Sequence, residues 1–219
     1  MERVVVDGST IAYERAGVGP LVVLLHGGLS DHREWRRQLV GLSDTFTVVA
    51  WDAPGCGDSS DADPSFRMPD YADALAGFVA ALDLGKPHLV GLSWGSTVAL
   101  EMYRRHPTIP ASLVLTSAYA GWAGSLAPEV VAERVDGLRR GLQLPPERWV
   151  REYWIPTLFT DRAPTDMVEE AVRDFSRAEE LHREIPNSEL IVLPDVGHQC
   201  NIEAAASYNA ALRAFLAKR

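Results

Sequence analysis

Short, uninterrupted apolar runs recur along the first half of the chain. The runs are Leu21–Leu25, Thr47–Trp51, His88–Leu92 and Leu113–Thr116. Such runs are typical of parallel strands that are buried on both faces of a sheet, because a half-exposed strand would alternate apolar and polar residues. Before them, Val4–Val6 and Ile11–Tyr13 flank an Asp-Gly pair, which predicts a β-hairpin.

Helical periodicity fills the segments between these runs. The apolar faces of an early and a late helix consist of Tyr71, Leu75, Phe78, Val79 and Leu82, and of Tyr208, Leu212, Phe215 and Leu216. A further helix begins directly after Ser93, and Leu190–Leu193 is predicted to be a late strand. A hairpin followed by alternating strands and helices predicts an α/β fold, with a mostly parallel central sheet and helices on both faces.

The alternation of strand and helix lapses between residues 121 and 175. This stretch holds Trp122, Trp149 and Trp154 among prolines and charged residues. We predict that residues 1–120 and 176–219 form one α/β core and that residues 121–175 form a helical cap inserted over the pocket. The aromatic residues of the cap would either line an apolar substrate site or pack the cap onto the core.

Composition narrows the class of protein. The chain has 219 residues, 47% of them hydrophobic, which suits one domain with a substantial core. Its net charge of −9 disfavours nucleic acid and anionic membranes as partners. No signal-peptide pattern or apolar run of roughly 20 residues is present, so we expect a cytoplasmic protein. The two cysteines are too few for a disulfide framework.

The segment Gly-Leu-Ser-Trp-Gly at residues 91–95 directly follows an apolar run and opens a helix. In that setting the pattern indicates a sharp strand-to-helix turn that exposes the Ser93 hydroxyl. The serine backbone would be strained, and glycine at 91 and 95 would prevent side chains from colliding. The turn directs the Trp94 N–H at the space above Ser93, where an oxyanion would form. Ser93 is therefore the candidate nucleophile.

With two further motifs, this turn resembles those of the α/β-hydrolases. The sequence His-Gly-Gly at residues 26–28 resembles their oxyanion loop, and residues 52–59, Asp-Ala-Pro-Gly-Cys-Gly-Asp-Ser, match their Asp-x-x-Gly-x-Gly-x-Ser turn. The resemblance covers most of the chain and implies an α/β-hydrolase fold. It further implies that the Gly28 N–H is the second oxyanion donor, with Leu29 as the fallback. His26 and Asp52 would have structural roles.

The general base must be a histidine able to take the Ser93 proton near neutral pH. The six histidines lie at positions 26, 32, 88, 106, 182 and 198. Only His198 is predicted in a loop between a late strand and the terminal helix, which is where α/β-hydrolases carry the base. Apart from the structural His26, we expect the others at the surface or at helix ends. His198 is therefore the candidate base.

The catalytic acid is missing from the position that the resemblance implies. Family members carry a strand and then an aspartate there, whereas residues 174–182 run from the cap straight into a helix. We therefore expect one strand fewer than usual, with Leu190–Leu193 paired directly and in parallel with Leu113–Thr116. A rival interpretation keeps the triad, because Asp161 follows a Pro-Thr-Leu segment like that of the family. Asp161 is then a candidate acid, and a solvated loop residue otherwise.

These residues predict a serine hydrolase, which would cleave a small, apolar carboxylic ester or related acyl compound through an acyl-Ser93 intermediate. No metal or cofactor is implied, because no Cys/His cluster has ligand spacing and no Gly-x-Gly-x-x-Gly follows a strand. The absent acid favours an alternative, a non-catalytic or impaired binding protein of the same fold. A proline iminopeptidase-like peptidase is a further alternative, favoured by the sequence Ser-Trp-Gly-Ser at 93–96. A homo-oligomer is also an alternative, since a sheet lacking a strand would expose an edge that could pair with another copy of the chain.

Overall fold

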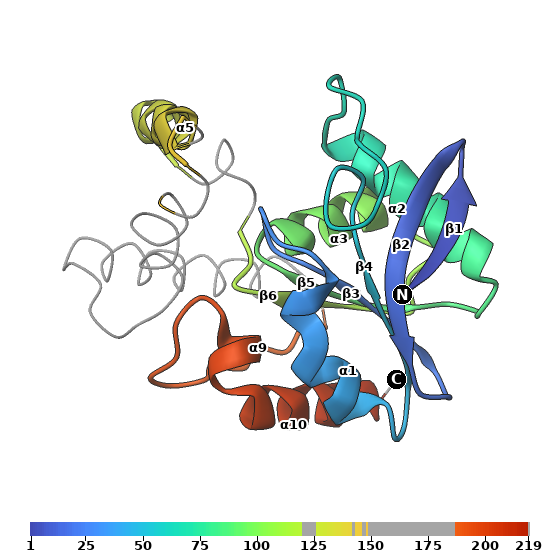
Figure 1. The fold of residues 1–219 in the computed structure, drawn as a ribbon. Helices are drawn as coiled ribbons and strands as arrows, with labels where there is room; N and C mark the ends of the chain where they lie inside the picture. The colour runs from blue at the N-terminus through green and yellow to red at the C-terminus, as the bar shows by residue number, and fades with distance from the viewer. Residues whose placement is uncertain (120–125, 142, 146–147, 149–186, 219) are drawn as a thin grey trace.

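The computed structural model describes residues 1–119, 126–141, 143–145, 148 and 187–218, and a central sheet with helices on both faces dominates it (Figure 1). The strands are β1 (Glu2–Val6), β2 (Ser9–Ala16), β3 (Leu21–Leu25), β4 (Thr47–Trp51), β5 (His88–Leu92) and β6 (Ser112–Thr116). The helices are the 3-10 helix η1 (His32–Trp35), α1 (Arg36–Leu42), α2 (Met68–Leu82), α3 (Trp94–Arg105), α5 (Pro128–Gly141), α9 (Cys200–Glu203) and α10 (Ala205–Leu216).

The six strands lie in the order β1-β2-β4-β3-β5-β6. The hairpin β1–β2 joins β4 in antiparallel pairing, and the pairs β3–β4, β3–β5 and β5–β6 are all parallel. Every residue of β3, β4 and β5 is buried, as the uninterrupted apolar runs require. The predicted α/β class with a mostly parallel sheet is thereby confirmed.

The two faces of the sheet are covered by different helices (Figure 1): α2 and α3 pack on one face, and α1 and α10 on the other. Neighbouring strand residues point to opposite faces, so Val23 belongs to the first core and Val22 to the second. Of the predicted late helical face, Tyr208 and Leu212 are buried against the second core. Helices packed on both faces of the sheet therefore fix the positions of β3 and β5, including their carboxyl ends.

The predicted strand at Leu190–Leu193 is wrong. The structure gives this segment no strand, and no described residue pairs with the outer edge of β6. Ile191 and Val192 are 45% and 52% exposed, and only Leu193 packs against the core. A central strand has buried side chains on both faces, whereas no residue of this segment is fully buried. The direct pairing with β6 is therefore not formed, although its loop still reaches that strand.

Most of the predicted cap, residues 121–175, lies outside the described residues, as do residues 176–186. Within the cap, α5 is described and lies apart from the sheet (Figure 1). The division into core and cap stays a prediction. Among the described helices, none has the length and apolar character to cross a membrane.

Candidate active site

Ser93 lies at the turn between β5 and α3 in a strained backbone conformation. Its φ is 53° and its ψ is −113°, far from the conformations that residues with a side chain prefer. The Ser93 N–H donates to the Thr116 carbonyl oxygen at 2.9 Å, which ties the turn to the end of β6. Strain of this kind amounts to roughly 1–3 kcal/mol and persists only where the surroundings enforce it. The sharp turn expected from the sequence is thus present.

The two glycines of the turn are required by close packing. A Cβ atom on Gly91 would lie 2.4 Å from the Gly95 carbonyl oxygen, and one on Gly95 would lie 2.2 Å from the Leu25 carbonyl oxygen. Real Cβ atoms essentially never approach that closely. Glycine therefore lets the start of α3 rest against the end of β3, which brings Ser93 beside the loop that follows β3.

That loop presents the predicted oxyanion donors. A Cβ atom on Gly28 would lie 3.7 Å from the Trp94 Cβ, so the two donor residues are brought together. Neither the Gly28 N–H nor the Trp94 N–H donates to any residue that the structure describes, whereas the Gly27 N–H is used by Glu34 at 2.7 Å. The first N–H groups of a helix have no partner within it, which leaves Trp94 free to donate. Gly28 stays the predicted second donor, with Leu29 as the fallback.

The predicted base is held at the same edge of the sheet as Ser93. The Ser117 hydroxyl donates to the His198 carbonyl oxygen at 2.9 Å, and Ser117 directly follows β6. Because β5 and β6 pair in parallel, with Leu92 opposite Thr116, their carboxyl ends adjoin. The His198 backbone therefore lies one strand away from the turn that carries Ser93. Asp161, the candidate acid, lies outside the described residues.

A family model described as alpha/beta hydrolase fold matches residues 20–153, which is more than half of the chain. The chain belongs to the α/β hydrolase fold family. The matched residues include the oxyanion loop and the Ser93 turn. The mostly parallel sheet and the strained serine between β5 and α3 agree with that membership.

Several of the named relatives are hydrolases. The 2-(acetamidomethylene)succinate hydrolase of Mesorhizobium japonicum is 30% identical over 136 residues, which cover 62% of this chain and 46% of the relative. The putative carbamate hydrolase RutD of Pantoea ananatis is 40% identical over 102 residues, 46% of this chain and 36% of the relative. The matches thus span less than half the length of these two curated relatives.

A solved structure is similar along its whole length. A thermophilic esterase from Thermogutta terrifontis, with malate bound, is 27% identical with a TM-score of 0.77, and the match covers 100% of this chain and 99% of the esterase. A hydrolase of Pseudomonas aeruginosa has a TM-score of 0.81 at 22% identity, covering 98% of this chain and 97% of that protein. The second likeness concerns the fold alone.

His26 of this α/β-hydrolase has a structural role. Its ring is fully buried, its Nδ1 donates to the Gly27 carbonyl oxygen at 2.8 Å, and its Nε2 accepts from the Ala53 N–H at 3.1 Å. Burial lowers the pKa of His26, so the ring is neutral at physiological pH. Both ring nitrogens are therefore used to fix the oxyanion loop against the segment after β4.

Asp31, His32 and Asp52 form a buried trio whose ligand atoms all lie within 4.8 Å of one another, a grouping that could hold a metal ion. The carboxylates already have partners. Asp52 accepts from the His32 N–H at 2.7 Å, from its Nδ1 at 2.8 Å and from the Asp58 N–H at 2.9 Å. Asp31 accepts from the Arg33 side chain and N–H. Internal donors thus satisfy the trio, and we assign it a structural role.

Two histidines, His32 and His88, correct the prediction of surface positions, whereas the burial of His26 agrees with its expected structural role. His26, His32 and His88 are all buried. His88 lies at the amino end of β5, with its Nδ1 2.8 Å from the Ser112 hydroxyl, and is thus at the opposite end of the strand from Ser93. His106 does lie at a helix end and contacts Asp73 at 2.7 Å. His182 lies outside the described residues.

Residues at the end of β6 were missed by the sequence interpretation. The Thr116 hydroxyl lies 2.7 Å from the buried Tyr208 hydroxyl, and its carbonyl supports the Ser93 turn. Ser117, with a φ of 47°, holds the His198 backbone. The sequence does show these two polar residues at the carboxyl end of an apolar parallel strand. Because ligands of α/β folds bind at that end, this position could have marked them as candidates for the site.

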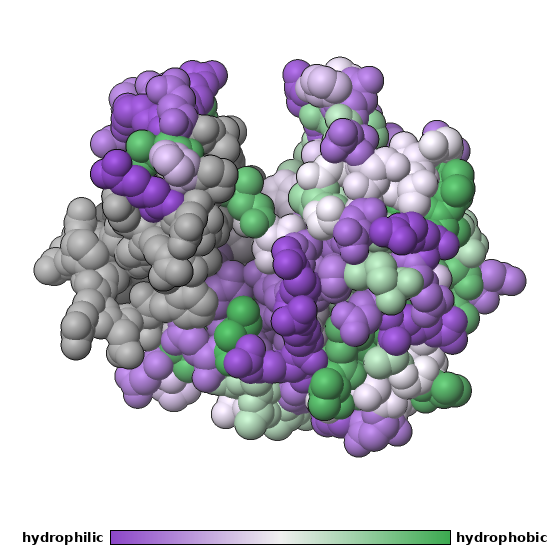
Figure 2. All heavy atoms as spheres, viewed as in Figure 1, coloured by the Kyte–Doolittle hydropathy of each residue, from purple (hydrophilic) through white to green (hydrophobic). Residues whose placement is uncertain are grey.

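An aromatic row lies beside the turn. Tyr71 packs edge to face on Trp94 with ring centroids 5.0 Å apart, and Phe66 packs likewise on Tyr71 at 5.4 Å. Phe66 belongs to the loop that precedes α2. Figure 2 shows the molecular surface hollowed between this loop and α5. The row gives the Ser93 region an apolar wall.

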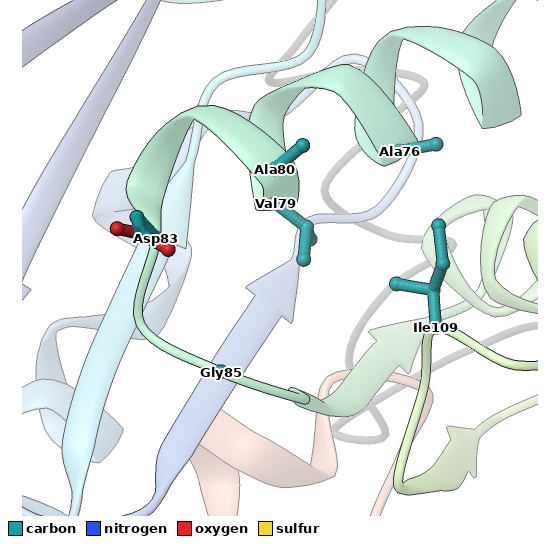
Figure 3. A pocket seen from close by; sticks show the side chains of 6 residues that line it. All are labelled: Ala76, Val79, Ala80, Asp83, Gly85 and Ile109. Carbon is teal, nitrogen blue, oxygen red and sulfur yellow. The ribbon is translucent and has the colours of Figure 1, made fainter.

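A separate small pocket of about 210 Å³ is lined by Ala76, Val79, Ala80, Asp83, Gly85 and Ile109 (Figure 3). It is smaller than ligand sites, which typically have roughly 300–1,000 Å³. Gly85 precedes β5 and Ser93 follows it, so the pocket adjoins the amino end of the strand and the turn adjoins the carboxyl end. The pocket is therefore not the candidate active site.

Proposed function

We propose that this α/β hydrolase cleaves a carboxylic ester, or a related acyl compound, of a small apolar molecule through an acyl-Ser93 intermediate. The observation that carries the proposal is the strained Ser93 turn packed beside Gly28, together with the Gly28 and Trp94 N–H groups, which donate to no residue that the structure describes. Such strain clusters at functional sites, where it fixes a reactive group in one geometry. The aromatic row beside Trp94 supports an apolar substrate.

The proposed reaction has two halves. The Ser93 Oγ attacks the acyl carbon while His198 takes its proton, and the Gly28 and Trp94 N–H groups hold the oxyanion. The tetrahedral intermediate then collapses, and His198 returns the proton to the departing alcohol. His198 then takes a proton from water as the water attacks the acyl-Ser93 ester, and it returns that proton to the Ser93 Oγ as the acid departs. Apart from the substrate and water, the scheme uses only side chains and backbone groups of this chain.

The names of the relatives support a hydrolase of ester or amide-type bonds. They do not identify the substrate of this chain, because the curated matches span less than half of those proteins. We propose Asp161 as the candidate acid that would orient His198. A serine–histidine dyad is the alternative, and loss of the acid has cost a related triad about 10⁴ in turnover. A dyad would therefore hydrolyse mainly esters with good leaving groups.

Covalent labelling tests the nucleophile. A fluorophosphonate probe should label the wild-type protein at Ser93, and Ser93→Ala should lose both labelling and hydrolysis of short p-nitrophenyl esters while remaining folded. Ser112→Ala is the matched control, because the Ser112 hydroxyl also contacts a histidine but lies at the opposite end of the sheet. That variant should keep both readouts.

Two results would contradict the proposal. Undiminished turnover in Ser93→Ala would place the chemistry elsewhere. A folded wild-type protein that neither labels nor turns over any ester would support the non-catalytic binding protein instead.

A further inference from the structure

Glu34, in η1, is a buried carboxylate that the proposed reaction does not use. The residue is 7% exposed. Its Oε2 accepts from the Gly27 N–H at 2.7 Å, and its Oε1 accepts from the Gln199 Nε2 at 2.9 Å. Both of these donors are neutral, so burial raises the pKa of the Glu34 carboxyl while the hydrogen bonds act in the opposite direction.

The partners of Glu34 belong to two loops that are far apart in sequence. Gly27 directly precedes Gly28, the proposed oxyanion donor, and Gln199 directly follows His198, the proposed base. The Glu34 carbonyl oxygen also accepts from the Asn201 side chain at 3.3 Å. A single residue thus links the oxyanion loop to the segment that carries the base.

Each of the two hydrogen bonds of the Glu34 carboxylate fixes the group that it binds. The Glu34 bond holds the Gly27 N–H at 2.7 Å and so fixes the backbone next to Gly28, where an added Cβ would lie 3.7 Å from the Trp94 Cβ. On the other side, the Gln199 Oε1 is buried and has no hydrogen-bond partner in the part of the chain that the structure describes. The orientation of the Gln199 amide is therefore set by Glu34.

We propose that Glu34 is a positioning residue for the hydrolysis, which sets the Gly28 N–H and the His198 loop relative to one another through its two carboxylate oxygens. The inference rests on the proposed function. It adds to that function a residue that touches neither substrate nor Ser93. Misplacement of reacting groups by about 1 Å can cost on the order of 100-fold in rate, so the loss of this link should be felt in catalysis.

Paired substitutions separate positioning from stability. Glu34→Ala should lower kcat by roughly 10- to 100-fold while KM changes by less than about twofold. Glu34→Gln should restore most of kcat, because an amide can accept from Gly27 with its oxygen and donate to a flipped Gln199. Leu216→Ala is the control for destabilisation, since this core residue lies in α10. It should lower the melting temperature and keep kcat, measured per labelled Ser93.

A second variant cuts the link from its other side. Gln199→Ala should also lower kcat, and its loss combined with Glu34→Ala should be less than the product of the two single losses. This cycle also serves if Glu34→Ala fails to fold, because Glu34→Gln with Gln199→Ala then removes the same bond.

The outcomes are distinct. A folded Glu34→Ala protein whose kcat equals that of the wild type, or multiplicative losses in the cycle, would overturn the positioning role while wild-type labelling upholds the proposed function. An inactive, unlabelled wild type would overturn both proposals. A fall in kcat that Glu34→Gln rescues, with KM unchanged, is the expected result.

Discussion

The two loops that frame Ser93 are built differently. The oxyanion loop grows out of the fully buried β3, and its His26 ring and Gly27 N–H are both held by buried partners. The His198 loop follows a segment with exposed Ile191 and Val192, and Asp195 in it is exposed with a φ of 57°. Hydrogen bonds from Ser117 and from Gln199 attach it to the rest of the fold.

The two loops differ in what holds them in place: the buried core fixes the oxyanion loop, whereas a few hydrogen bonds attach the His198 loop. An oxyanion donor stabilises charge only if it is fixed before the charge develops, so its loop benefits from a rigid core. A base must approach the nucleophile and then the leaving group, and a loop attached at a few points can adjust. Substitutions in the oxyanion loop and its packing should therefore affect folding, whereas those in the His198 loop should affect rate.

The largest effect is expected at Gly95, where the Ser93 turn packs on the end of β3. Gly95→Ala would place a Cβ 2.2 Å from the Leu25 carbonyl oxygen, so main chain must move, and we expect a loss of at least about 3 kcal/mol in the free energy of unfolding. Urea denaturation measures it. Gly137→Ala in α5 is the control, because its added Cβ meets nothing within 4 Å and alanine favours helix. Equal stability of both variants would refute the packing argument.

A smaller, pH-dependent effect is expected at His26. Burial lowers the pKa of His26, so the unfolded chain binds a proton that the folded protein does not. Its contribution to stability is fully present above the unfolded pKa of about 6.5 and is lost as the pH falls below it. Between pH 7 and pH 5.5, the wild type should lose about 1 kcal/mol more than His26→Asn. Parallel stability curves for the two proteins would show that His26 titrates alike in both states.

The smallest effect is expected at Ser117, which holds the His198 loop. Ser117→Ala removes one hydrogen bond to the His198 carbonyl oxygen, a contribution of about 1 kcal/mol. We expect kcat to fall roughly 3- to 10-fold with KM nearly unchanged and the melting temperature to fall by no more than about 2–4 °C. Steady-state kinetics on a p-nitrophenyl ester measures it, with Ser112→Ala at the other end of β6 as control. A marked loss of stability without a change in kcat would contradict the expectation that the attachment of the His198 loop affects rate and not folding.

The sheet could be predicted because its signal is local. Three of the parallel strands, Leu21–Leu25, Thr47–Trp51 and His88–Leu92, have the predicted bounds, since burial on both faces demands an uninterrupted apolar run. The Ser93 turn could be predicted for the same reason, because its glycines and the flanking elements are contiguous. Leu190–Leu193 has the same apolar character, yet pairing depends on an available edge and on cover from elsewhere in the chain.

The hydrogen bonds between the two loops could not be predicted, because they join residues that are far apart in the sequence and meet only in the folded protein. Glu34 lies between Arg33 and Trp35, in a sequence that suits an exposed turn as well as a buried one. Its carboxylate becomes informative only when Gly27 and Gln199 converge on it. The buried His32 and His88 were misjudged for the same reason, since a histidine looks alike in sequence whether it is solvated or bonded to a buried partner.

The contacts that join residues near Glu34 to those near Gln199 also govern when the protein can acquire its final form. The Glu34–Gln199 bond and the Gln38–Asn209 bond connect positions 165 and 171 residues apart. At synthesis rates of about 5–20 residues per second, the late partner emerges from the ribosome roughly 10–30 s after the early one. Until then, α10 cannot cover the apolar face formed by Val22 and Leu24. The nascent chain must therefore carry an uncovered sheet face, a surface that chaperones recognise, and folding is completed only once synthesis has reached α10.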